Sequence, residues 1–214
     1  MPDSEPYTQR ELSLLNPFGG PEFAEQAVRS IRSADAATYN DCRALFLDPK
    51  YCDVIGEVRR AKIHEALVGL AEKQGLRYSF EKPERQRYNN LLIQAGGSLL
   101  TVARMYGRRR LSLPSKFRCD FAQTRLDLFG ETDSSYIIPD KLLKTLVLAY
   151  GVGIVRGRPM VTGIELQEIG LSPRDVTFRI DLASKIDAQS IGERETVFDD
   201  FDIKIKENRG KRYA

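Results

Sequence analysis

The stretch Asn90-Leu-Leu-Ile-Gln-Ala-Gly-Gly-Ser-Leu-Leu-Thr-Val-Ala-Arg104 predicts a β-hairpin in the middle of the chain. Two apolar runs flank Gly96 and Gly97, and consecutive glycines supply the positive φ angles that a tight primed turn requires. Both faces of the two strands are largely apolar. We therefore expect the hairpin to lie within a sheet, with a helix packed over it.

Helical periodicity dominates the residues before the hairpin. Residues 54–74 place apolar side chains on one face and end before a glycine suited to a C-cap, while residues 21–47 begin with a proline suited to a first helical turn. Residues 77–82 alternate as a strand would, with Tyr78 and Phe80 on one side. We expect residues 1–20, rich in proline, glycine and polar side chains, to form a flexible N-terminal arm.

Further elements follow the hairpin. The pattern predicts a helix over 116–128, a short helix over 139–146 and strands over 147–155, 160–169 and 176–182. The predicted fold class is α+β: N-terminal helices, a central antiparallel β-hairpin sheet, a following helix and a C-terminal three-strand meander. We expect a single domain over 21–184 and a charged tail over 185–214 that is ordered only in part.

Composition excludes several classes of protein. The chain has 214 residues, 42% of them hydrophobic, which is enough for a core of its own. Its three cysteines form no Cys-x-x-Cys pair and its single histidine, His64, excludes a two-histidine metal site. No run approaches the roughly 18 to 20 apolar residues of a membrane helix, and the N-terminus lacks a secretory signal. We expect a cytoplasmic protein without a membrane segment, metal or cofactor.

The strands at 91–94 and 99–103 contain no carboxylate. They follow a helix and precede a further predicted helix and strand, an element order that resembles the nuclease fold shared by many restriction enzymes. Those nucleases hold a divalent metal with carboxylates on the second and third core strands, so the resemblance implies an inactive copy. The other acidic set of suitable type is Asp140, Glu165 and Gln167. Asp140 is explained as a negative charge that stabilises the start of a helix, and Glu165 and Gln167 are explained as outward positions of an alternating strand.

Positive charge is concentrated in one segment. The chain carries 33 Lys+Arg against 30 Asp+Glu, yet residues 104–118 hold six basic residues and no acid. Tyr106 and Phe117 lie among them, and arginine forks with aromatic rings suit phosphates and bases. The connection before the hairpin is also basic and could lie at the same end of the sheet. The predicted nucleic-acid-binding residues are Arg85, Arg87, Arg108, Arg109, Arg110, Lys116 and Arg118.

We therefore expect a non-enzymatic binding or regulatory protein that contacts nucleic acid, or a partner acting on nucleic acid, through this Arg-rich face. An acidic protein partner would use the same residues, because protein interfaces also favour Arg and Tyr. The first alternative is therefore a protein-interaction subunit or an antitoxin-like neutraliser. The second is a divergent metal-dependent nuclease that uses Asp140 and Glu165. The sequence leaves DNA or RNA, sequence preference and oligomeric state open.

Overall fold

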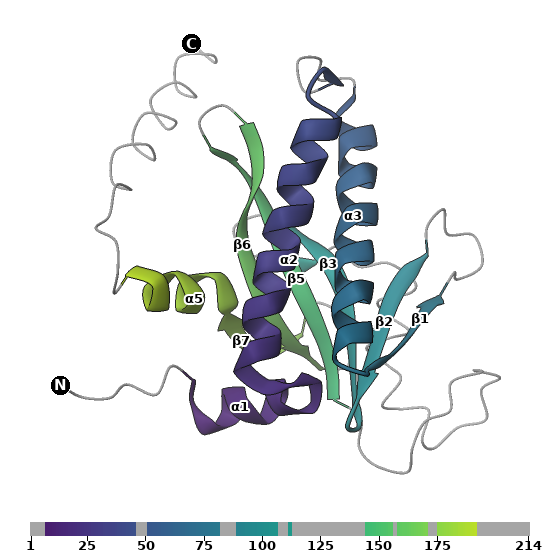
Figure 1. Ribbon diagram of the computed structural model, residues 1–214. Coiled ribbons are helices and arrows are strands. Elements are labelled where there is room, and N and C mark those ends of the chain that lie inside the picture. The colour runs from purple at the N-terminus through teal and green to yellow at the C-terminus, as the bar shows by residue number, and fades with distance from the viewer. Residues whose placement is uncertain are drawn as a thin grey trace.

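The protein is an α+β protein built on one mixed, mostly antiparallel sheet, which confirms the predicted fold class (Figure 1). The computed structural model describes residues 7–45, 51–81, 89–106, 111–112, 144–155, 158–170 and 175–191. The elements in chain order are α1 (Gln9–Leu15), η1 (Asn16–Phe18), α2 (Gly20–Asp41), α3 (Cys52–Lys73), β1 (Arg77–Glu81), β2 (Asn90–Ala95), β3 (Ser98–Tyr106), β4 (Leu111–Ser112), β5 (Lys144–Val155), β6 (Arg158–Ile169), β7 (Val176–Asp181) and α5 (Leu182–Ile191).

The predicted hairpin is confirmed. β2 and β3 are antiparallel, with Leu92 opposite Thr101 and Ile93 opposite Leu100. Gly96 and Gly97 have φ angles of 50° and 77°, a conformation that costs glycine little because it lacks a Cβ. The hairpin therefore forms because both of its turn positions hold the residue type that the turn geometry demands.

The two groups of strands predicted from the sequence form one sheet. Its order is β1-β2-β3-β5-β6-β7, with β4 paired to the end of β3. β3 and β5 are parallel, and the other pairs are antiparallel, so β5, β6 and β7 form the expected meander. The prediction of a helix up to residue 146 was wrong at its end, because β5 already begins at Lys144. The helix predicted over 116–128 lies outside the described residues.

The main core lies between the sheet and the antiparallel pair α2 and α3, which cover one face (Figure 1). Ile31 and Ile63 from the helices and Ile93 and Leu148 from the sheet are each fully buried in it. Burying one such side chain contributes roughly 1.5–3 kcal/mol. None of the described helices is long and apolar enough to cross a membrane.

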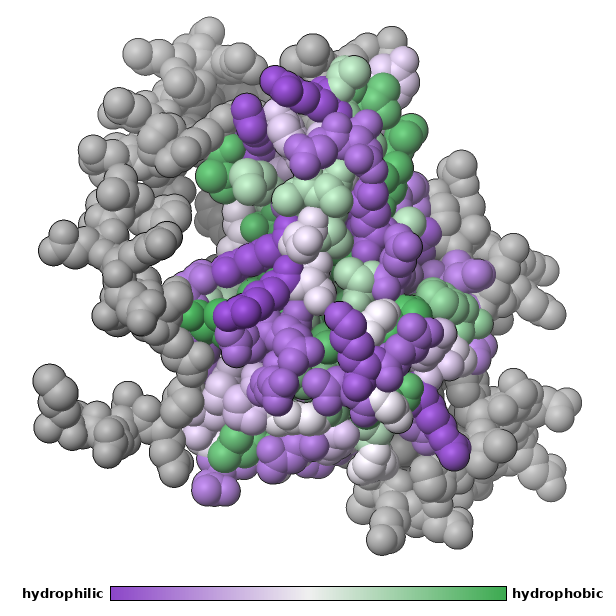
Figure 2. Space-filling view, in the orientation of Figure 1, coloured by the Kyte–Doolittle hydropathy of each residue, from purple (hydrophilic) through white to green (hydrophobic). Residues whose placement is uncertain are grey.

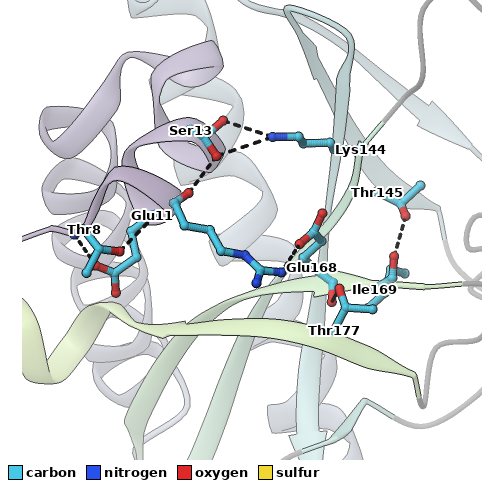
Figure 3. Close-up of polar contacts among 9 residues, drawn as sticks. Thr8, Glu11, Ser13, Lys144, Thr145, Glu168, Ile169 and Thr177 are labelled. Atoms are coloured by element: carbon cyan, nitrogen blue, oxygen red, sulfur yellow. Dashed lines mark hydrogen bonds and ion pairs between the residues drawn. The ribbon is translucent and has the colours of Figure 1, made fainter.

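The N-terminal residues 7–20 pack against the domain, which contradicts the prediction of a flexible arm over this part of the chain. Thr8 and Glu11 form a capping box that starts α1, and Leu15 and Phe18 are buried in the core. Figure 3 shows that polar contacts also attach α1 to the sheet. Arg10 donates to Glu168 at 3.4 Å, and Lys144 lies 3.5 Å from the backbone oxygen of Ser13.

A buried ion pair joins both long helices to β6. Arg59 Nε on α3 lies 2.6 Å from Asp35 Oδ1 on α2, and the two side chains are only 4% and 5% exposed. Arg59 also donates to the carbonyl of Pro159 at 2.9 Å, while the other carboxylate oxygen of Asp35 accepts from the amide of Val161 at 2.7 Å. These hydrogen bonds supply partners that two buried charges need.

Asp35→Ala should destabilise the protein by about 3–5 kcal/mol, because it leaves the guanidinium of Arg59 buried without its carboxylate. Glu25→Ala is the matched control, since Glu25 pairs with Arg29 on the exposed side of the same helix, and it should cost less than about 1 kcal/mol. Urea unfolding followed by circular dichroism measures both changes. Similar midpoints for the two variants would contradict the role given to the buried pair.

Candidate nucleic-acid interface

The strand register brings the ends of two basic segments to one end of the sheet. β1 and β2 are antiparallel, with Glu81 opposite Asn90, so both ends of the connection 82–88 lie there. β3 runs antiparallel to β2 toward the same end, where Tyr106 pairs with Leu111 of β4. The connection 107–110 therefore starts and finishes at that end too.

The seven predicted binding residues all lie outside the described residues. They occupy three places in the chain: the connection from β1 to β2, the connection from β3 to β4, and the segment after β4. In that order they are Arg85 and Arg87; Arg108, Arg109 and Arg110; and Lys116 and Arg118. The structure shows the strand ends at which these segments begin.

The basic residues of α3 differ in their contacts. Arg59 is buried in its ion pair and is not part of an exposed surface. Lys62 lies 2.7 Å from Asp41, and this hydrogen bond raises the pKa of Lys62. Arg60 donates to the carbonyl of Asn89 at 3.2 Å, so it attaches α3 to the residue just before β2. Of these three residues, Arg60 is the one that borders the end of the sheet where the basic segments begin.

His64, the single histidine, is buried between α3 and β1. It is 8% exposed, and its ring centroid lies 6.3 Å from that of Phe80. Burial, together with the nearby charge of Arg60, lowers the pKa of His64 from 6.5 to about 4. The imidazole is therefore neutral at neutral pH and adds no positive charge to this region.

Two aromatic side chains remain exposed on β1, the strand at the outer edge of the sheet (Figure 1). Tyr78 is 39% exposed and Phe80 is 47% exposed, and their rings meet edge to face with centroids 6.4 Å apart. The hydroxyl of Tyr78 donates to Glu72 at 2.8 Å, which raises the pKa of Tyr78. The alternation of residues 77–82 placed both rings on one side of a strand, but gave no sign that this side would be open.

Glu165 and Gln167 are buried, contrary to the expectation that they point outward. They are 3% and 1% exposed and lie on the sheet face away from α2 and α3. A second cluster of buried apolar residues, which includes Val147 and Ile169, lies on this face, so side chains on both faces of β6 are buried here. Gln167 donates to Glu165 at 2.8 Å, and Arg179 lies 3.9 Å from the same carboxylate oxygen.

The carboxylate of Glu165 thus has partners from two neighbouring side chains, Gln167 and Arg179. Asp140, the other acid of the predicted set, lies outside the described residues. Within the parts of the chain that the structure describes, no group of three or more His, Cys, Asp or Glu side chains is arranged to hold a metal.

A groove runs between α2 and α3 on their outer face. Small side chains form much of its lining, and charges of both signs stand beside them; the residues include Ser33, Ala37, Ala66, Gly69, Lys62 and Glu65. Figure 2 shows the helix face as largely hydrophilic, with paler residues along the helix pair. The charged residues of the lining are Arg29, Lys62, Lys73 and Glu65. Two of the three basic residues have an acidic partner, because Arg29 pairs with Glu25 and Lys62 with Asp41.

No protein-family model, curated protein or solved structure matches the chain.

Acidification should destabilise the fold through His64. The unfolded histidine has the ordinary pKa of 6.5 and the folded one a pKa of about 4, so between these values the unfolded state binds more protons. Stability is therefore fully present above the unfolded pKa and falls as the pH drops below it. The loss from pH 7.5 to pH 5 should be about 2 kcal/mol for the wild type and much smaller for His64→Gln.

Urea unfolding at several pH values measures this difference. No other imidazole is present in the chain to confuse the comparison. An identical pH dependence in the two proteins would show that His64 is not held neutral by the fold.

Proposed function

We propose that the protein binds nucleic acid at the end of the sheet where β1, β3 and β4 meet the basic connections. The observation that supports this proposal is the register of β1, β2 and β3, which brings the ends of two Arg-rich segments together. Separately, each segment is a short basic loop of a kind common on protein surfaces. Residues 82–88 and 107–110 together hold six basic residues and one acid, in a chain whose net charge is only +3.

The dimensions suit a short length of phosphate backbone. Neighbouring strands lie about 4.8 Å apart, so the ends of β1, β2 and β3 span roughly 10 Å across the sheet. This width is on the order of a few nucleotides of a phosphate backbone, whose rise along the axis of a duplex is about 3.4 Å per nucleotide. Arginine is suited to such contacts because its planar fork can hold one phosphate by two hydrogen bonds.

An acidic protein could occupy the same region, and its binding would also weaken with salt. A metal-dependent nuclease is a second candidate, favoured by the buried position of Glu165 beside Gln167 on β6. It requires Mg²⁺- or Mn²⁺-dependent cleavage of DNA or RNA that is lost in Glu165→Gln. Intact substrate after incubation with the wild type and either metal would remove this candidate.

Replacement of Arg108, Arg109 and Arg110 by Ala should weaken nucleic-acid binding and flatten its salt dependence. Each lost phosphate contact should reduce the slope of log affinity against log salt by about 0.9 on duplex DNA or about 0.7 on a single strand. Fluorescence anisotropy of labelled DNA and RNA at several salt concentrations measures both quantities. Arg29→Ala, an exposed arginine on α2, should leave the slope unchanged.

Circular dichroism of both variants checks that each of them still folds as the wild type does. If the wild type fails to bind any of these nucleic acids at low salt, the proposed function is wrong, and the acidic protein partner becomes the better hypothesis.

A further inference from the structure

We infer that the nucleic acid is single-stranded and that its bases stack on Tyr78 and Phe80 of β1. This inference rests on the proposed function and names its substrate class. The two rings are exposed at 39% and 47%, although large aromatic side chains are among those that a protein core usually takes up. They lie on β1, a strand at one edge of the sheet formed by the described residues.

The two rings are held in place before any ligand binds. Tyr78 is fixed by its hydrogen bond to Glu72 at 2.8 Å, and Phe80 lies next to the buried ring of His64. The two rings also contact each other edge to face. A ligand that stacks on them therefore has little side-chain entropy to remove, which strengthens binding for a given contact area.

Their spacing favours an extended single strand. Tyr78 and Phe80 are two residues apart on one face of a strand, a separation of about 6.6 Å along the backbone. Bases in a duplex are stacked at about 3.4 Å along each strand and cover one another's faces. A base can reach each ring only if the bases are separated from one another, as they are in a single strand bound to aromatic side chains.

The described charges around the rings are balanced. Lys73 at the end of α3 and Arg77 at the start of β1 are exposed, and the acids beside the rings are Glu72, which accepts the hydrogen bond of Tyr78, and Glu81, the last residue of β1. The sequence continues from Glu81 into the basic segment that begins with Lys82. Phe80 lies against the ring of His64, which is neutral at neutral pH and so adds no charge beside it.

Alanine variants test the inference. Tyr78→Ala and Phe80→Ala should each weaken binding of oligo(dT) by roughly 5- to 150-fold, the range for loss of one base stacked on an aromatic ring. Tyr78→Phe keeps the ring but loses the hydrogen bond to Glu72, so it should weaken binding much less than Tyr78→Ala does. Ile154→Ala is the matched control, since it removes a side chain that is 56% exposed on another strand, and it should leave affinity unchanged.

A fluorescent variant reports stacking directly. The chain contains no tryptophan, so Phe80→Trp introduces a single indole at the position of interest. Its emission should be quenched by oligo(dT) and not by a hairpin duplex at the same concentration. Binding of oligo(dT) without quenching, unchanged affinity in both alanine variants, or equal affinity for duplex and single strand would overturn the inference while leaving the proposed function in place. Failure of every nucleic acid to bind would overturn both.

Discussion

The register of β3 is the constraint on which the rest of the structure depends. β3 pairs with β2 and β4 along one edge and with β5 along the other, so it joins the hairpin to the meander and makes one sheet of them. A slip of one residue would exchange Leu100, which faces the helices, with Thr101, which faces away. The same register determines at which end of the sheet β3 ends. The segment that holds Arg108, Arg109 and Arg110 therefore begins at that end.

Buried polar contacts fasten the layers around this sheet. On the helix side, the pair of Asp35 and Arg59 ties α2 and α3 to the backbone of β6. On the opposite side, Glu165 and Gln167 hydrogen-bond to each other within an apolar cluster. Both sets use hydrogen bonds to compensate the burial of charge. Arg59 therefore stabilises the fold and is not part of the proposed interface. That interface consists of the strand ends and of β1 at the edge of the sheet.

Patterns among neighbouring residues predicted the hairpin and the long helices. They could not predict which strands far apart in the sequence pair with each other. The hairpin at Gly96 and Gly97 and the helix over 54–74 follow from turn chemistry and periodicity, which are properties of neighbouring residues. The parallel pairing of β3 with β5 joins residues more than forty positions apart, and no local pattern encodes it. The capping box of Thr8 and Glu11 was a readable signal of α1, but the prolines around it favoured an arm.

The candidate site was predictable in part for the same reason. Glu165 was predicted to point outward because alternation shows which residues share a face of a strand. Alternation does not show whether both faces of that strand are buried. For Tyr78 and Phe80 the sequence gave the shared side, and their exposure depends on β1 lying at the edge of the sheet. The seven arginine and lysine residues stay a prediction, since they lie outside the described residues.

Photocrosslinking tests most directly whether nucleic acid lies along this edge and end of the sheet. A photoreactive single-stranded oligonucleotide would be irradiated with the protein, and crosslinked tryptic peptides would be identified by mass spectrometry. Cleavage after Arg77 releases a peptide that begins at Tyr78 and contains Phe80. Crosslinks are expected in this peptide and at one tyrosine beside each basic segment: Tyr88, which follows Arg87, and Tyr106, which lies two residues before Arg108. Crosslinks confined to the outer face of α2 and α3, with none in these peptides, would contradict it.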